Sequence, residues 1–371
     1  GHQFDPADLI KPTSSLTGCV PELRPVRNWY FDLPNFREQL GEIAENLEAD
    51  PEVRPVVSQT AKEFLVPPVI YIKNELEADY RAIESKLPAH EFHAAEGNKQ
   101  SFELEFANIE SRDAARDELT AAGIRFRTGK ALVPFRISGN VEWGVKVPEM
   151  EGVDDLTVWC WPESLWAPVS FSATALEARG EELSAVRDWW CSPDARVYQF
   201  IGQDNLYFYG VAQPALWMAL ENGNAEVAYP QPGDLQQTTL IANHHILFGK
   251  VKASSSGAVK PPSADQLLEH YTVDQLRAHW LGLGLDVKSV GFKPKPFEVD
   301  EAKRNDPRVA DPVLKEGALL TNVFNRLARS CFYEAQKNFE GFMPLGAPAA
   351  DVVARCHKVM AEYEAIMHKA E

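Results

Sequence analysis

The chain has 371 residues, of which 45% are hydrophobic and 25% charged, and its formal net charge at pH 7 is −17. This composition is typical of a globular protein with two or three domains and excludes the disordered and fibrous classes. The acidic balance disfavours non-specific binding to nucleic acid, although it leaves room for a local basic strip. No apolar run is long enough to cross a bilayer and no signal segment opens the chain, so we expect a cytoplasmic protein without a membrane partner.

The five cysteines lie far apart in the sequence, at Cys19, Cys160, Cys191, Cys331 and Cys356. Structural zinc sites usually use CxxC pairs, and the sequence has none. The sequence therefore supports no zinc and no other metal site, and we expect reduced thiols.

The first 140 residues divide into two segments. Residues 1–36 are rich in Pro, Gly and short polar residues, with one strand-like stretch at 27–36 that Pro34 interrupts. Residues 37–140 begin with helical spacing and then alternate between strand and helix patterns. The expected elements are helices at 37–65, 75–88 and 111–123 and strands at 101–109 and 124–137. We interpret the later part as a small β-α-β module, and a ferredoxin-like insert is one reading of it.

The rest of the chain predicts an α/β fold that gives way to helices. Three apolar runs should be strands, and a helix pattern at 206–220 separates the last two, which favours a parallel sheet. The expected strands are 154–161, 195–202 and 238–248. After Ser263 the pattern is mostly helical and ends in an amphipathic helix at 349–370.

One candidate site lies where the run from Phe200 to Gly210 leaves its strand. Gly202 ends the strand and Asp204 follows, at the edge where open α/β sheets bind ligands. An aspartate there can hold a ribose hydroxyl, a metal ion or an ammonium group. Helix capping by Asp204 or Asn205 explains the same residues equally well.

Two further segments combine residues that could line a site. The loop at 249–257 holds two lysines, three serines and two glycines, a set that can cradle phosphates, although a solvated linker is the commoner explanation. The run at 157–166 holds three tryptophans and a glutamate, which could wall an apolar pocket or simply pack in a core. His244 and His245 could be ligands, but an ordinary strand-edge role is the commoner one.

These segments occur in an order that resembles a known family. The matching stretches are the opening 36 residues, VEWGVKVP (141–148), LTVWCWPESLW (156–166), VYQFIGQDNLYFYGVAQPALWMAL (197–220), KASSSG (252–257), TVDQLRAHWLGLGL (272–285) and LLTNVFNRLARSCF (319–332). Together they resemble methionyl-tRNA synthetase, a class I aminoacyl-tRNA synthetase. The resemblance covers nearly the whole chain except about residues 66–130, which look like an additional insert.

The resemblance implies a domain order. Residues 1–36 would be a connective segment that follows the family's zinc knuckle, and 37–140 would hold the insert. Residues 141–262 would form the second half of a Rossmann-type catalytic domain. Residues 263–371 would form a stem-contact region and an α-helical anticodon-binding bundle. Because the first catalytic half is missing, we expect the chain to be an N-terminally truncated or divergent member.

The resemblance also implies an activity and site residues. The family forms an aminoacyl-adenylate from ATP, as its Mg²⁺ complex, and an amino acid, here methionine, and transfers it to tRNA. Trp159 falls on the methionine-pocket tryptophan, and Gly202 and Asp204 fall on the stretch that lines the adenosine and amino-acid sites. The family's phosphate-contacting, catalytic KMSKS loop corresponds to Lys252, Ser254 and Ser256. Anticodon-reading positions correspond to Asn325 and Arg329, which are four apart and so project from one helix face.

Several departures from the family pattern point to an alternative. The chain has no HIGH motif, and the KMSKS-like loop carries Ala253 and Ser255 in place of Met and Lys. In the substrate pocket, Tyr209, Glu163 and Trp166 replace the family's histidine, proline and tyrosine. A carboxylate beside an apolar pocket is costly unless it is paired. The alternative is a synthetase-like paralogue, with altered or lost amino-acid specificity, that binds tRNA or nucleotide.

Overall fold

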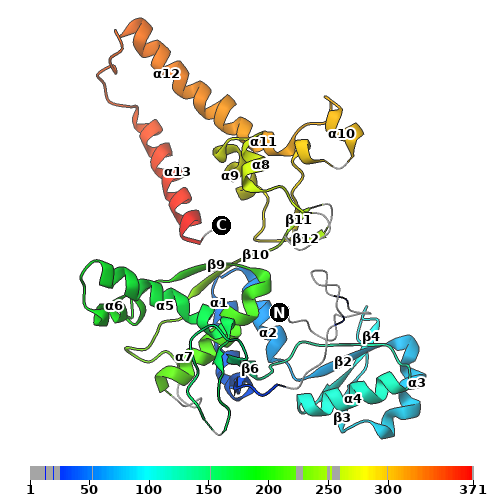
Figure 1. Ribbon diagram of the computed structural model, residues 1–371. Coiled ribbons are helices and arrows are strands. Elements are labelled where there is room, and N and C mark those ends of the chain that lie inside the picture. Colours follow the sequence, from blue (N-terminus) through cyan, green and yellow to red (C-terminus); the bar gives the residue numbers. More distant parts are fainter. Residues whose placement is uncertain are drawn as a thin grey trace.

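The protein has a mixed α/β fold with short sheets, seen here in a computed structural model (Figure 1). The structure describes residues 13, 20, 26–51, 53–150, 152–222, 229–248, 251–252, 260–298 and 300–369. Figure 1 shows the elements up to β10 in one part of the molecule and α8–α11 in a second part, from which α12 extends away before α13 runs back toward the first part.

The N-terminal elements contribute buried side chains to the main hydrophobic core. Leu33, Leu40 and Ile43 are buried, and they pack with Val211 and Met218 from much later in the chain. The expected strand at 27–36 is shorter than predicted, because Pro34 starts a 3₁₀ helix directly after it. The elements are β1 (Tyr30–Phe31), the 3₁₀ helix Leu33–Phe36, α1 (Arg37–Ala49) and α2 (Pro55–Leu65), and β1 pairs with β6 (Phe135–Arg136).

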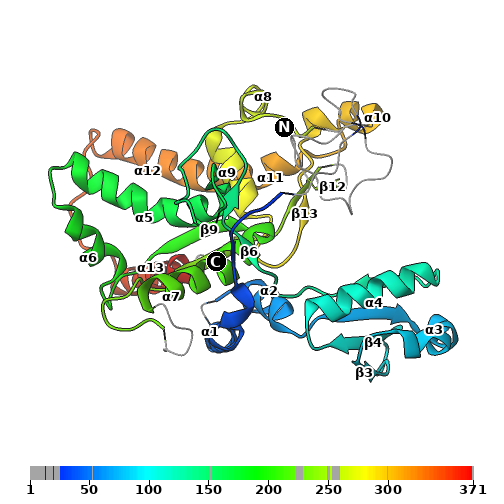
Figure 2. The same ribbon diagram turned by 60° about the horizontal axis from the view of Figure 1, so that its bottom comes forward.

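The next segment forms a four-stranded antiparallel sheet with two helices on one side (Figure 2). Its chain order is β-α-β-β-α-β and its strand order is β3-β4-β2-β5, which is the ferredoxin-like arrangement. Alternate residues of β2 and β4 are fully buried against the helices. The elements are β2 (Val69–Lys73), α3 (Glu77–Ile83), β3 (His90–His93), β4 (Ser101–Phe106), α4 (Ile109–Ala121) and β5 (Phe126–Thr128), with 3₁₀ turns at Asn74–Leu76 and Glu84–Lys86.

Helix α4 begins two residues earlier than the sequence pattern predicts. Asn108 is its N-cap, because the Asn108 side chain accepts a hydrogen bond from the backbone N–H of Ser111 at 2.8 Å. The helix ends before Gly123, whose φ of +75° few other residues adopt, as expected.

The strand expected at 154–161 forms over only two residues, and the run then passes into a helix. Only Thr157 and Val158 pair as a strand, and α5 starts at Cys160. Pro162 is compatible with this start, because it lies in the first helical turn, where the N–H that proline lacks would have no helical partner. The elements here are β7 (Ser138–Gly139), β8 (Thr157–Val158), α5 (Cys160–Ala178), the 3₁₀ turn Leu183–Ala185 and α6 (Val186–Trp190).

The predicted parallel pair forms, but the strand expected at 238–248 is divided at His244 and His245 into two strands that belong to different sheets. Strand β9 (Tyr198–Gly202) pairs in parallel with β10 (Thr239–Asn243), and the helices between them make the crossover. Those helices are a 3₁₀ turn (Gln203–Asn205), a π-helix (Phe208–Ala212) and α7 (Gln213–Asn222). The described part of this sheet contains these two strands.

The C-terminal third is mostly helical, as predicted. A small core joins Leu267, Tyr271, Leu276, Phe292 and Val313. The strands are β11 (Ile246–Phe248), β12 (Val251–Lys252) and β13 (Val290–Gly291). The helices are α8 (Ala264–Leu268), α9 (Val273–Leu281), the 3₁₀ turn Lys295–Phe297, α10 (Glu301–Asn305), α11 (Pro312–Ala318), a π-helix (Leu319–Phe324), α12 (Asn325–Asn338) and α13 (Ala350–Lys369).

Candidate functional site

The carboxyl ends of β9 and β10 form the edge at which the sequence places its first candidate site. Gly202 is the last residue of β9 and pairs in register with Asn243, the last residue of β10. Asp204 follows in the 3₁₀ turn and is exposed. Ligands of open α/β sheets bind at this edge, so the position of Asp204 suits ligand contact.

The Asp204 carboxylate folds back over the strand end. A Cβ added at Gly202 would lie 2.7 Å from Asp204 Oδ1, closer than carbon and oxygen tolerate. The N-cap of the following turn is Gly202, and no side chain caps it. Asp204 lies inside this turn, and its carboxylate occupies the space that a Cβ at position 202 would take.

Arg54 also reaches this edge, a contact that the sequence does not predict. Its Nη1 donates to Asn243 Oδ1 at 2.7 Å and to the carbonyl oxygen of Ala242 at 3.1 Å. Arg54 is the N-cap of α2, before Pro55, and lies 189 positions from Asn243 in sequence. Pro55 marks the helix start in the sequence, but nothing local predicts that the guanidinium meets β10.

Trp159 sits at the junction between β8 and α5. Its backbone N–H donates to the carbonyl of Ile137 at 2.9 Å. The Arg136 guanidinium carbon lies 4.2 Å from the indole centroid, a cation–π contact. On β7, a Cβ added at Gly139 would lie 2.7 Å from Trp159 Cε3. The half-buried ring is thus fixed between a cation and a glycine backbone.

Glu163 and Trp166 both lie on α5, three positions apart, and both are exposed. Trp166 keeps 39% of its surface accessible. Glu163 lies in the first helical turn, where the helix dipole favours a negative charge. The desolvation cost expected for a carboxylate in an apolar pocket therefore does not arise here.

Tyr209 lies in the π-helix and contacts the start of α5. Its hydroxyl lies 3.2 Å from Ser164 Oγ. Next to it, Trp161 and Phe208 stack with ring centroids 3.5 Å apart and an interplanar angle of 6°. The structure thus brings Tyr209 to the helix that follows Trp159. π-Helices are rare and occur often at functional sites, a feature the sequence analysis missed.

The cavity beside Tyr209 is small. It has a volume of about 20 Å³, and Ile43, Gln213 and Trp217 are among its lining residues. A volume of ~10–15 Å³ is needed to hold one water, so this cavity is too small for an amino-acid side chain.

The KMSKS-like loop lies mostly outside the described residues. Lys252 belongs to β12 and pairs with Leu247 of β11, but its side chain is not described. Ser254 and Ser256 lie outside the described residues altogether.

Asn325 and Arg329 line one hollow on the surface of α12, as their spacing predicts. The hollow has a volume of about 560 Å³ and is also lined by Asn322, Arg326 and Tyr333. Arg329 Nη2 donates to the Tyr333 hydroxyl at 3.1 Å, and this bond lowers the pKa of the Tyr333 phenol. Figure 1 places α12 far from β9 and β10, so the structure describes two separate candidate sites.

Comparison with known proteins places this geometry in a family. The sequence model of the class I tRNA synthetases (M) matches residues 1–73 and 125–298 and passes over the residues between. A methionine–tRNA ligase of Chloroflexus aggregans is 26% identical over 95% of this chain and 46% of its own length. Those of Nocardioides sp. and Korarchaeum cryptofilum are each 24% identical, over 89% and 82% of this chain and 44% and 40% of their own lengths.

The chain spans less than half the length of these curated relatives. Within the described residues, no helix is both long and apolar enough to cross a membrane. Because the matched residues make up more than half of the chain and include Gly202, Asp204 and Trp159, the chain belongs to the class I tRNA synthetase (M) family.

Proposed function

We propose that this chain supplies the second half of the catalytic site and the tRNA-binding part of a methionine–tRNA ligase. The observation that carries the proposal is the turn from Gly202 to Asp204 at the carboxyl end of two parallel strands, inside the family match. The names of the relatives support methionine as the amino acid. We assign residues 141–262 to the catalytic half, after a connective segment (1–36) and an insert (37–140), and 263–371 to the stem-contact and anticodon-binding parts.

In this proposal each catalytic-site residue has one role. Asp204 orients the amino-acid ammonium group or the ribose of ATP, and Gly202 leaves the space that this requires. Trp159 packs against the methionine side chain. Lys252, with Ser254 and Ser256, contacts the phosphates of Mg²⁺-bound ATP and stabilises charge as pyrophosphate leaves.

In the same proposal the hollow on α12 recognises tRNA. Asn325 can donate to and accept from a base edge, and Arg329 and Tyr333 offer a charged plane and a ring on which an unpaired base can stack. Their exposure leaves these groups accessible to a loop of RNA.

Activation requires the HIGH motif, which does not occur in these 371 residues. The test therefore compares the chain alone with the chain joined to a HIGH-containing half, by ATP–pyrophosphate exchange with each of the twenty amino acids. We expect exchange with methionine for the joined protein and none for the chain alone. Absence of exchange with every amino acid would exclude the ligase activity.

The second candidate is a paralogue with altered or lost amino-acid specificity that binds tRNA or nucleotide. Two observations favour it: the cavity beside Tyr209 holds little more than one water, and the KMSKS-like loop carries Ala253 and Ser255 in place of Met and Lys. Exchange with another amino acid, or tRNA binding without any exchange, would select this candidate over the first.

A further inference from the structure

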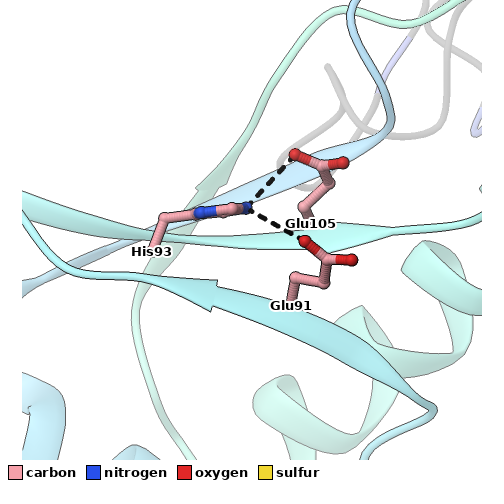
Figure 3. Close-up of side chains that lie close together, drawn as sticks. All are labelled: Glu91, His93 and Glu105. Carbon is pink, nitrogen blue, oxygen red and sulfur yellow. Dashed lines mark ion pairs between the residues drawn. The ribbon is translucent and has the colours of Figure 1, made fainter.

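Three potential metal ligands gather on the open face of the insert's sheet. Glu91 and His93 lie on β3 and Glu105 lies on β4 (Figure 3). Their neighbours along the strands, Phe92 on β3 and Leu104 on β4, point to the other face and pack with α3 and α4. The three side chains therefore share the face that the helices leave uncovered.

The three side chains converge to within coordination range of one point. His93 Nε2 lies 3.3 Å from Glu105 Oε2 and 4.0 Å from Glu91 Oε2. All three potential ligand atoms lie within 4.8 Å of one another. Ligands that bind one zinc ion tetrahedrally at ~2.0–2.2 Å lie roughly 3.4 Å apart. Small side-chain rotations would therefore bring the three atoms onto one ion.

The pairing register adds a second, independent argument. Glu91 is the direct partner of Glu105 across the ladder, and like charges placed directly opposite each other destabilise a sheet. In the described part of the chain, His93 is the one basic side chain within ion-pair distance of either carboxylate. Glu103, the partner of His93, has Lys99 Nζ at 2.9 Å instead. Arg37 lines a hollow together with Glu91 and Glu105, but its guanidinium donates to the Leu65 carbonyl and lies outside ion-pair distance of both carboxylates. A divalent cation would therefore offset the repulsion between Glu91 and Glu105.

We propose that Glu91, His93 and Glu105 bind one divalent first-row transition-metal ion, for which zinc is the best match. An imidazole nitrogen with two carboxylate oxygens suits zinc, whereas Mg²⁺ and Ca²⁺ favour all-oxygen sets. The ligands stand on paired strands anchored by a buried core, which holds the site in place before the ion arrives. Because residues 74–124 lie outside the family match, the site is independent of the ligase proposal.

Zinc titration of the full chain by calorimetry tests this site. We expect Glu91→Gln and His93→Asn each to weaken binding at least about tenfold, or ~1.4 kcal/mol. Glu103→Gln, on the same face but paired with Lys99, is the matched control and should bind as the wild type does. Exposed Cys160, Cys331 and Cys356 could also take zinc. Spectra with Co²⁺ in place of zinc distinguish the cysteines from the proposed site. A cobalt ion bound by Glu91, His93 and Glu105 shows no thiolate charge-transfer band.

Thermal melting separates a metal site from a plain ion-pair cluster. With EDTA, Glu91→Gln should melt no lower than the wild type, since it removes the like-charge contact with Glu105 and leaves the closer His93–Glu105 pair in place. With zinc, the wild type should rise in melting temperature and the variant should not. Three results would each overturn the proposal: no zinc binding, equal binding by wild type and His93→Asn, or a Glu91→Gln loss of stability that zinc does not alter.

Discussion

The hydroxyl of Tyr209 lies 3.2 Å from the hydroxyl of Ser164, and this contact joins the two helical segments that carry the candidate substrate residues. Ser164 lies on α5, which begins directly after Trp159. Tyr209 lies in the π-helix, which follows the turn that holds Asp204. The stacked pair Trp161 and Phe208 reinforces the same junction. These contacts hold the two segments against each other.

Two neighbouring tyrosines should respond in opposite ways to loss of their hydroxyl groups. Tyr209→Phe removes the bond to Ser164 and should lower the free energy of unfolding by ~0.5–1.5 kcal/mol. The Tyr207 hydroxyl is buried with no hydrogen-bond partner among the described residues, and burial raises its pKa to about 12. Tyr207→Phe should therefore raise the free energy of unfolding, by ~1 kcal/mol or more. Urea unfolding measures both, and a loss of stability in Tyr207→Phe would contradict the packing described.

Two glycines should likewise respond in opposite ways to alanine. A Cβ at Gly139 would meet the Trp159 ring at 2.7 Å, so Gly139→Ala should destabilise the protein by ~1–3 kcal/mol and shift Trp159. Gly41 lies inside α1 with nothing within 4 Å of the added Cβ, so Gly41→Ala should stabilise it by up to ~1 kcal/mol. Thermal denaturation measures the stability of both variants against the wild type. Equal stability of Gly139→Ala and wild type would show that the ring is not held there.

The pair of His279 and Glu316 should make stability depend on pH in the acid range. His279 Nδ1 lies 3.0 Å from Glu316 Oε2, joining α9 to α11, and this hydrogen bond lowers the pKa of the Glu316 carboxyl. A carboxyl with a lowered folded-state pKa adds stability that is fully present above its unfolded pKa of ~4.3 and is lost as pH falls through the folded value.

Glu316→Gln tests that contribution. The variant should be less stable than the wild type at pH 7, and the difference should shrink as the pH falls below ~4.3. Urea unfolding at a series of pH values from neutral to acid measures the difference. A difference that stays constant across this range would show that the carboxylate charge does not contribute.

Arg329 should contribute to tRNA binding if the hollow on α12 recognises the anticodon. Arg329→Ala and Asn325→Ala should each weaken tRNA binding about tenfold, or ~1.4 kcal/mol, in a filter-binding assay. Arg308, an exposed arginine between α10 and α11 that pairs with Asp306, provides the matched control. If Arg308→Ala weakens binding as much as Arg329→Ala does, general charge explains the effect and the hollow has no special role.

Strands and helices whose hydrophobic residues recur with a clear period were predicted from the sequence. Examples are the parallel pair of β9 and β10, within the runs at 195–202 and 238–248, and the last helix at 349–370. The break between β10 and β11 inside the second run was not predicted. The aromatic run at 154–161 was predicted as a strand, because apolar aromatic residues occur in strands and in buried helices alike. The composition of the run therefore does not locate the start of α5 at Cys160.

Contacts between distant residues were not predictable in the same way. Gly202 and Asp204 were foreseen because the strand end and the acid are adjacent in sequence. Arg54 at the end of β10 was not foreseen, because the contact depends on how α2 packs against the sheet. The group of Glu91, His93 and Glu105 depends on the pairing of β3 with β4, which one sequence does not fix.

The most direct test of the central claim is methionine-dependent ATP–pyrophosphate exchange in the chain joined to a HIGH-containing half, with and without Asp204→Asn. Glu103→Gln, on the open face of the insert's sheet, serves as the control. We predict exchange by the parent and the control, and a rate at least about tenfold lower for Asp204→Asn, or ~1.4 kcal/mol of activation free energy. Equal exchange by Asp204→Asn and the parent would contradict the placement of the substrate site at the ends of β9 and β10.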